Sequence, residues 1–527
     1  MRIVFVGLVL ALPVFTPASS FAQGLAQRLD AVRDGTIRMS FATRPEVCGD
    51  GRFIGVDTPR GFRMYTFHGN GVSHGGYSVE TLEDVQPDCK TGPMRLVIEK
   101  TGGQVTDLRA AVGVAWRASA GVTDLGTVSA PQVATWMLDN VTGFDRDDLI
   151  PVAFVAAVAA DSARVADRLL AIGRTKTLPA DARSQSLRWL TDVSAREGKP
   201  AAADEVLRGI IRDDHDGSVV RERSVRELDK TTANDAFLRD TYRAVTATTV
   251  REWIIRRVAE ADTPENVGWL KALALDSRES RPLRDRAIRS LGDDLKRRAD
   301  VEAMYSRLDD PELKSRALRV IAESGDSAAM VRIRSIALSD AEPIDVRDQA
   351  VRVLSQATDE ATTRWLQSLV NNTAQPEQIR DRAIRVLVER RQVDFIQQAY
   401  PRLESDALKD RVIRSVAESR GADAKAWMLE IAGNENESLD LRDRAIRSFA
   451  ERGVPSVDLA GLYDRLTQPA LKQRVVRTLA ERGDDAAVDK LTAIADKDPD
   501  PEMRRFVLRR LGETKNAKAR AYLERKI

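Results

Sequence analysis

The most regular feature of the chain is a nine-residue pattern of apolar and charged positions, called the nonamer below. One copy reads LRDRAIRSL at Leu283–Leu291, and its core RDRAIR returns at Arg380–Arg385 and Arg442–Arg447. Positions 1, 6 and 9 are apolar in every copy, position 2 is Arg or Lys, and position 7 is always Arg. The copies begin at Ala182, Val220, Val250, Leu283, Leu313, Val346, Ile379, Leu408, Leu441, Leu471 and Met503. Such internal recurrence predicts a repeat array.

The nonamer has the spacing of an amphipathic helix. At about 100° per residue, positions 1, 5, 6 and 9 form one wide apolar face, and positions 3, 4 and 7 lie opposite it. Position 3 is acidic in seven copies, as in Asp381, four residues before the constant Arg. That order favours an ion pair within the helix. Position 2 falls inside the apolar arc, so we expect its charge to reach an acid along the packing seam, in the neighbouring helix pair.

Two sets of basic residues are therefore candidate sites. Position 2 predicts an ion ladder between repeats, formed by Arg284, Lys314, Arg347, Arg380, Lys409, Arg442, Lys472 and Arg504. Position 7 predicts a ridge formed by Arg289, Arg319, Arg352, Arg385, Arg414, Arg447 and Arg477. The ridge has two interpretations, an exposed half of ion pairs within each helix or a binding surface for an acidic partner. The first is favoured, because most copies carry the neutralising acid.

Each repeat is predicted to be a pair of helices about thirty residues long. Proline precedes position 1 in most later copies, and proline suits the first turn of a helix. A second amphipathic segment lies between successive nonamers, and it carries an aromatic ring at a fixed place. These rings are predicted to pack between repeats. They belong to Tyr305, Tyr400 and Tyr463, in the sequence Tyr-x-Arg-Leu, and to Trp269, Trp365 and Trp427.

The final repeat, Asp498–Ile527, carries a family resemblance. Asp498, Pro499, Arg504, Leu511 and Gly512 match a pattern of Asp-Pro, a short gap, Val-Arg and Leu-Gly, with Met503 at the valine position. Asp309, Pro311 and Lys314 give a looser match. The segment resembles the HEAT-like repeats of phycobilisome-lyase-type proteins. This resemblance extends over about Leu149–Ile527 and implies a right-handed α-solenoid, with the position-2 arginine in an ion ladder.

The first residues have the features of a secretory signal peptide. Arg2 precedes the apolar run Ile3–Phe15, and small residues follow as far as Ala22, after which cleavage is expected. The run is too short for a membrane span and contains Pro13. No later stretch is long enough either, so we expect an exported protein, periplasmic or extracellular.

Only two cysteines occur, Cys48 and Cys89. In an oxidising compartment they are expected to form a disulfide, and neither lies in a Cys-x-x-Cys pair that would favour a metal site. A reactive thiol or a metal ligand is the alternative.

The region 23–128 follows a different pattern and predicts a small, mostly β domain. A short helix at Leu25–Val32 is followed by alternation at Thr36–Ala42 and Met94–Lys100, which indicates half-buried strands. Thr101-Gly102-Gly103 predicts a hairpin turn into Val105–Val112. Glycine-rich loops are expected between Cys48 and Gly76.

No catalytic motif is present. There is no nucleophile elbow, phosphate-binding loop, dinucleotide motif or His-Glu-x-x-His sequence. The three histidines are His68, His74 and His215, and Ser73, Ser78 and Asp50 have no spacing that supports a triad. Some HEAT-like solenoids are di-iron hydroxylases or chromophore lyases. The first use paired His-Glu ligands, which one repeat histidine cannot provide, and export argues against the second.

Composition narrows the function further. The chain of 527 residues holds 82 basic and 80 acidic residues, a formal charge of +2, which excludes the unbalanced basic surface of a nucleic-acid binder. The predicted organisation is a signal peptide at 1–22, the β domain at 23–128 and an α-solenoid of about 12 helix pairs at 129–527, with clear repeats from 182. The predicted function is an exported, monomeric, non-catalytic scaffold without cofactors that binds a protein along its curved face. The alternative is a ligand-binding or enzymatic site in the β domain, with the solenoid as a rigid arm.

Overall fold

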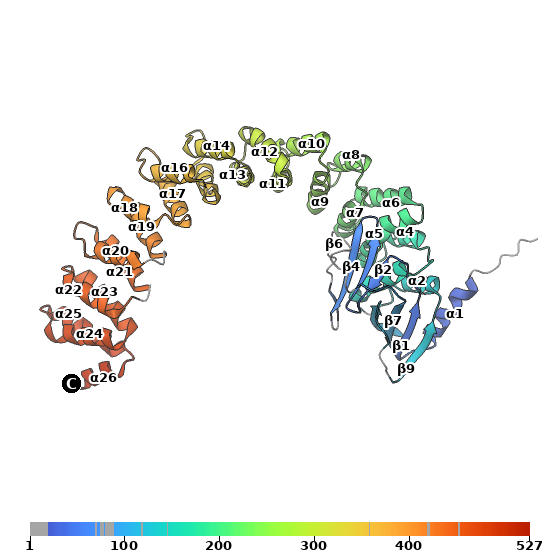
Figure 1. Cartoon of the computed structure of the whole chain (residues 1–527), viewed down its shortest axis with the longest axis horizontal. Coiled ribbons are helices and arrows are strands. Elements are labelled where there is room, and N and C mark those ends of the chain that lie inside the picture. The colour runs from blue at the N-terminus through green and yellow to red at the C-terminus, as the bar shows by residue number, and fades with distance from the viewer. Residues whose placement is uncertain are drawn as a thin grey trace, which may run out of the picture. The chain divides into compact units, whose positions relative to one another are not determined.

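The nonamers fall on helices in the computed structural model of the chain (Figure 1). The structure describes residues 19–68, 71–73, 78–79, 89–116, 120–144, 146–357, 359–418, 422–451 and 454–526. The expected signal peptide lies almost entirely outside these residues. The chain divides into two compact units, unit 1 at Met1–Trp269 and unit 2 at Leu270–Ile527. Each is described by itself.

Unit 1 contains a four-stranded sheet in the order β8-β7-β1-β9. Its strands are β1 (Gly35–Phe41), β7 (Met94–Thr101), β8 (Gln104–Ala111) and β9 (Val122–Thr127). β1 pairs antiparallel with β7 and parallel with β9. Buried residues alternate along β1 and β7, as the sequence pattern predicts. Gly102 and Gly103 both have positive φ, 60° and 88°, as the predicted turn between β7 and β8 requires.

A second sheet in unit 1 was missed by the sequence pattern. Its described strands are β2 (Val47–Gly49), β3 (Phe53–Thr58), β4 (Gly61–His68), β5 (Gly71–Ser73) and β6 (Ser78–Val79). The prediction of glycine-rich loops was wrong here, because Phe53–Val56 are all buried and so show no alternation. Gly55 is needed where β3 passes β4, since a Cβ there would lie 2.0 Å from the Phe62 ring.

The helices of unit 1 begin with α1 (Ser19–Asp30), which starts six residues before the predicted Leu25. After the sheets come α2 (Ala130–Asp139), α3 (Ile150–Ala159), α4 (Ala166–Arg174), α5 (Ala180–Arg196), α6 (Pro200–Arg212), α7 (Ser218–Glu227), α8 (Thr232–Thr241) and α9 (Thr248–Ala259). All ten residues of α3 are buried, as expected for a helix that is apolar on every side. Thr43 forms a β-bridge with Ala160, so the β region covers the end of α3.

The division between the units falls within α10 (Pro264–Leu275), and unit 2 continues as an α-solenoid. The nonamer helices of unit 2 are α11 (Arg281–Gly292), α13 (Pro311–Ala322), α15 (Ile344–Val353), α17 (Glu377–Glu389), α19 (Asp406–Glu418), α21 (Leu439–Glu451), α23 (Pro469–Arg482) and α25 (Pro501–Glu513). Each packs on the next to form one layer (Figure 1). The solenoid of helix pairs predicted from the repeats is confirmed.

The second layer of unit 2 consists of the helices between the nonamers. They are α12 (Arg298–Met304), α14 (Ser327–Leu338), α16 (Glu360–Val370), α18 (Val393–Ala399), α20 (Ala422–Gly433), α22 (Ser456–Arg465) and α24 (Asp485–Lys497), followed by α26 (Ala517–Glu524). α12 and α18 are short because a 3₁₀ turn follows each, at Tyr305–Arg307 and Tyr400–Arg402. All three Tyr-x-Arg-Leu sequences thus end a helix, two of them through a 3₁₀ turn and the third at the end of α22.

Local sequence sets where the nonamer helices begin. Pro311 stands in the first turn of α13, where a proline costs no hydrogen bond, and the Asp310 carboxylate accepts from the backbone N–H groups of Glu312 and Leu313. Asp500 caps α25 in the same way, through the N–H of Glu502. No helix in the described part of the chain is long and apolar enough to cross a membrane.

Cys48 on β2 is joined to Cys89 by a disulfide, with their Cα atoms 5.2 Å apart. Cys89 lies beside the bridge in which Lys90 and Gly49 exchange backbone hydrogen bonds. The bond therefore ties β2 to the segment that leads into β7.

We expect the double variant Cys48→Ser/Cys89→Ser to lower the stability of unit 1 by about 4 kcal/mol. A cross-link between residues separated by 41 positions removes roughly that much entropy from the unfolded chain. Chemical denaturation measures the loss, and thiol labelling of unreduced protein provides the control. Two reactive thiols in the native, unreduced protein would contradict the prediction.

Candidate functional site

Six of the eight position-2 arginines are buried and cap the helix that precedes their own. In each of the six, the Nε–H donates to the backbone carbonyl ten residues earlier, near the end of that helix. The pairs are Arg183–Gly173, Arg221–Ile211, Arg284–Ala274, Arg347–Ala337, Arg380–Val370 and Arg442–Ala432, at 2.9 to 3.2 Å. A cation there also favours the negative end of the helix dipole. The sequence pattern did not predict this cap, whose only signal is the constant spacing.

The remaining guanidinium nitrogens reach toward the following repeat. Arg284 Nη2 lies 2.5 Å from Asp309, and Arg380 Nη1 lies 3.3 Å from Glu404. Arg347 pairs with Asp340 in its own loop and donates to Gln375 of the next, at 2.5 Å. These contacts run from one repeat to the next, as the predicted ion ladder requires.

Three position-2 arginines depart from this scheme. The Arg251 guanidinium lies over the Tyr242 ring, 4.2 Å from the ring centroid. Arg442 has a buried Nη2 without a partner among the described residues. Arg504 donates to the Asp498 carbonyl at 2.5 Å instead of reaching an acid of a later repeat.

Where position 2 is Lys, the arrangement changes to a Tyr–Lys–acid cluster. Each ammonium lies over a tyrosine ring and faces an acid of the next repeat. The clusters are Tyr305–Lys314–Glu342, Tyr400–Lys409–Glu437 and Tyr463–Lys472–Asp498, with Nζ to ring-centroid distances of 5.5, 5.3 and 5.0 Å. Burial and then the neighbouring Glu437 raise the pKa of Tyr400 well above its usual value, so that hydroxyl stays protonated.

A second link between repeats runs through positions 3 and 4 and was missed by sequence reasoning. The position-4 arginine of one nonamer helix donates its Nε–H to the position-3 Asp of the preceding one. The pairs are Arg316–Asp285, Arg382–Asp348, Arg411–Asp381, Arg444–Asp410 and Arg474–Asp443, at 2.5 to 2.9 Å. The signal was the frequent Arg at position 4, which the helical wheel placed on the solvent side.

The position-7 ridge is only partly neutralised. Four of its arginines pair with the Asp one turn earlier: Arg289, Arg385, Arg414 and Arg447. Arg477 lies 5.6 Å from the Phe506 ring centroid. Arg319 and Arg352 are exposed and form no ion pair within the described residues. Ser315 stands at position 3 before Arg319, and Arg382 holds both carboxylate oxygens of Asp348, at 2.9 and 2.8 Å. Neither Arg319 nor Arg352 therefore has an acid one turn earlier to pair with.

Like charge therefore gathers on α11, α13 and α15. Burial lowers the pKa of Arg319, and the neighbouring Arg316, Arg352 and Arg289 lower it further. The position-7 residues of these three helices, Arg289, Arg319 and Arg352, are called the basic patch below. It is the part of the ridge best suited to an acidic partner.

In unit 1, β4 covers the corresponding face of α5, because the position-7 residue Arg188 lies 5.2 Å from the Tyr65 ring centroid, and β4 also contacts α7. Arg63 lies 2.8 Å from Asp192 and 3.5 Å from Glu227. Tyr65 stacks on Trp189 with ring centroids 5.4 Å apart. These contacts join the β region to the first repeats through ion pairs and aromatic packing.

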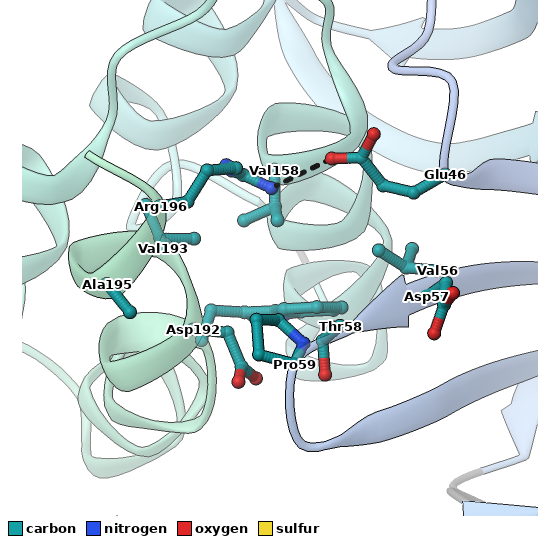
Figure 2. Close-up of a pocket in the computed structure, with 11 residues that line it drawn as sticks. Glu46, Val56, Asp57, Thr58, Pro59, Val158, Asp192, Val193, Ala195 and Arg196 are labelled. Carbon is teal, nitrogen blue, oxygen red and sulfur yellow. Dashed lines mark ion pairs between the residues drawn. The ribbon is translucent and has the colours of Figure 1, made fainter. Parts of the chain in front are cut away.

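A cleft of about 490 Å³ lies beside this junction (Figure 2). Side chains from α5 form one wall, and β3 with the turn after it forms the other. Arg196 extends across the cleft to Glu46, at 3.6 Å (Figure 2). The lining residues are Glu46, Val56, Asp57, Thr58, Pro59, Val158, Trp189, Asp192, Val193, Ala195 and Arg196.

Asp192 is the most unusual group in the cleft. Its side chain is 4% exposed, Oδ2 faces Arg63, and Oδ1 accepts no hydrogen bond from the described residues. Burial raises the pKa of this carboxyl, although Arg63 and Arg60 oppose the shift. The Trp189 Nε–H is also buried and has no acceptor among the described residues. The lining also holds the polar groups of Glu46, Asp57, Thr58 and Arg196, so the walls of the cleft are mixed in character.

The residues considered for catalysis fall on strands of the second sheet, in a turn and in the connection between two helices. His68 ends β4, His215 lies between α6 and α7, and His74 lies outside the described residues. Asp50 accepts from the backbone N–H groups of Arg52 and Phe53, a turn-forming role. Ser73 and Ser78 belong to β5 and β6. The described part of the chain contains no group of His, Cys, Asp and Glu residues suited to a metal ion.

Comparison with known proteins identifies HEAT repeats at residues 459–526. No curated protein sequence matches the chain. Human deoxyhypusine hydroxylase in complex with glycerol is 14% identical, with 50% of this chain and 96% of that chain covered and a TM-score of 0.22. Importin β is 11% identical over 75% of this chain and 56% of its own, with a TM-score of 0.30. Kap121p bound to Ste12p is 13% identical over 72% and 48%, with a TM-score of 0.39. Scores this low carry no argument about function.

The first prediction from the site compares Arg380→Ala with Arg385→Ala. Arg380→Ala removes a buried cap, leaves the Val370 carbonyl unsatisfied, and should destabilise unit 2 by roughly 2–4 kcal/mol. Arg385 is 40% exposed, so its loss should cost under about 1 kcal/mol. Chemical denaturation of both variants tests the difference. A silent Arg380→Ala would refute the structural role of position 2.

The second prediction concerns Asp381, which Arg385 and Arg411 share. Asp381→Ala should destabilise unit 2 by about 1–2 kcal/mol, because it leaves the Arg411 guanidinium without its acid between two helices. A double-mutant cycle should give Asp381 and Arg411 a coupling energy above about 0.5 kcal/mol. The matched cycle of Asp381 with Arg444, which pairs with Asp410, should give none. Equal coupling in both cycles would exclude the proposed pairing.

Proposed function

We propose that this protein is an exported, non-catalytic scaffold. It binds another protein on the polar face of its nonamer helices, the face that carries position 7. The observation that carries the proposal is the junction in unit 1, where that face already holds a folded β region through Arg63, Asp192 and Glu227. A repeat array presents equivalent faces along its length, so other repeats can bind a separate chain in the same manner.

The basic patch is the proposed centre of recognition. Ion pairs satisfy most of the ridge, and a satisfied arginine loses a partner when it binds a new one. Arg319 and Arg352 have no ion pair to give up within the described residues, so an acidic segment gains a new charge-assisted contact with each. The partner is therefore expected to present carboxylates at the spacing of adjacent nonamer helices.

Export, the monomeric state and a phycobilisome-lyase-type origin of the repeats are parts of the same proposal. Export is supported by the apolar run at Ile3–Phe15 and by the cysteine pair of the β region. The repeat type is supported by the Asp-Pro start of the last repeat at Asp498.

The test is cross-linking and affinity purification of the full chain from the envelope and the medium of its source cells. Arg319→Gln/Arg352→Gln should reduce recovery of the principal cross-linked partner about tenfold, as expected for the loss of two charged contacts. Arg385→Gln/Arg414→Gln is the matched control, because each removed arginine already pairs within its own helix.

The same experiment separates the rival function. Deletion of residues 23–128, with the array still folded by circular dichroism, should leave partner recovery on the basic patch unchanged. Cross-links confined to the β region, together with loss of capture on that deletion, would overturn the scaffold in favour of a site in the β region.

A further inference from the structure

A separate candidate site lies on the outward face of the four-stranded sheet in unit 1. The inward face of this sheet carries buried apolar residues such as Ile37, Leu96 and Ile98. The outward face carries Arg38 on β1 and Arg95 on β7, and both side chains are only partly exposed. The second face of such a sheet is normally exposed to solvent. The partial burial of Arg38 and Arg95 therefore calls for an explanation.

The side chain over this face is Trp116, which lines an open cleft of about 710 Å³. The indole centroid lies 5.3 Å from the Arg38 guanidinium carbon and 5.8 Å from that of Arg95. Val97, Val114 and Val122 add apolar wall, and the turn at Asp50–Arg52 contributes to the lining. The volume suits a small organic ligand, and the mixture of apolar wall and a few charged groups is typical of ligand pockets.

The charges that line this cleft are unequal. Four arginines face two carboxylates, Asp50 and Glu99. Arg38 pairs with Asp124 at 2.8 Å, Arg52 with Asp50 at 2.6 Å, and Arg109 with Asp107 at 2.9 Å. Three of the four arginines are therefore neutralised by nearby acids.

Arg95 is the exception. It forms no ion pair within the described residues, and its Nε–H is shielded from solvent without an acceptor. A shielded donor without an acceptor is costly, and an anion placed against it would supply both the acceptor and the missing charge. The indole beside the guanidinium also suits a flat apolar group.

We propose that this cleft binds a small anionic ligand with a planar apolar body. Its carboxylate or phosphate accepts hydrogen bonds from the Arg95 guanidinium, and its body lies against Trp116 and the valine wall. A cationic ligand is disfavoured because it would face the Arg95 guanidinium, which has no ion pair within the described residues. The site is independent of the basic patch in unit 2, so the proposed scaffold function and this site can fail separately.

Equilibrium dialysis of the full chain against 2-naphthoate tests the proposal, with the neutral 2-naphthalenemethanol as the matched probe. Wild-type protein should bind 2-naphthoate saturably with a Kd below about 1 mM, and the alcohol at least about tenfold more weakly. Arg95→Gln should weaken 2-naphthoate binding about tenfold and leave the alcohol unaffected. Trp116→Leu should weaken both probes. Arg146→Gln, at an exposed pair with Asp148, is the control and should change neither.

Competition identifies the anionic group. Displacement of 2-naphthoate by inorganic phosphate from wild-type protein, but not from Arg95→Gln, indicates phosphate ligands, and displacement by acetate alone indicates carboxylates. Each result supports the site. Equal binding of the two naphthyl probes, absence of saturable binding, or an unchanged affinity in a folded Arg95→Gln variant would overturn it. The thermal unfolding midpoint of each variant shows that it is folded.

Discussion

Stacking one nonamer helix on the next requires that a basic side chain at the seam be buried without being left unmatched. Removing a guanidinium from water costs several kcal/mol unless hydrogen bonds and an opposite charge replace the solvent. Here the Nε–H of Arg380 finds a carbonyl at the end of the preceding helix, and its terminal nitrogens find an acid of the next repeat. Apolar burial drives the stacking, and these polar contacts determine how closely the helices can approach.

The shared carboxylates determine the register of that stacking. Asp381 accepts from Arg385 of its own helix and from Arg411 of the following one, so a shift by one helical turn would break one of the two contacts. Apolar faces alone tolerate sliding, because hydrophobic contact has no direction. Directional ion pairs at positions 3 and 4 therefore select one alignment among several that bury similar apolar area. A middle repeat without the acid, such as the one with Ser315, lacks this constraint on the alignment. It also leaves the positive charge of Arg319 exposed.

Much of the fold could be predicted from the sequence because repetition reveals periodicity. The spacing of the nonamer predicts a helix, its apolar face and the buried position 2. The pair Gly102-Gly103 predicts a turn with positive φ, which few other residues adopt. The second sheet escaped prediction because Phe53–Val56 are buried on both faces, and a strand without alternation resembles no periodic pattern. The pairing of Arg316 with Asp285 and the contact of Arg95 with Trp116 were also not predicted, since a helical wheel or a strand pattern treats one element at a time. Contacts between elements depend on how the elements pack together, and the periodicity within one helix or strand does not contain that information.

The caps and the shared carboxylates have a consequence for how such an array can change in length. The hydrogen bond of each arginine cap joins residues ten positions apart within one helix pair. A duplicated pair therefore includes both the capped helix end and the arginine that caps it. The position-3 acid and the position-4 base are complementary across every junction where both occur, so a copied pair finds matching charges on both sides. The Tyr–Lys–acid clusters interrupt this equivalence, because they join two different kinds of repeat. A gene duplication that copies one repeat with Arg at position 2 would therefore lengthen the array without unmatched ends, as the consecutive repeats of Arg347 and Arg380 illustrate, whereas two repeats with Lys at position 2 never follow one another.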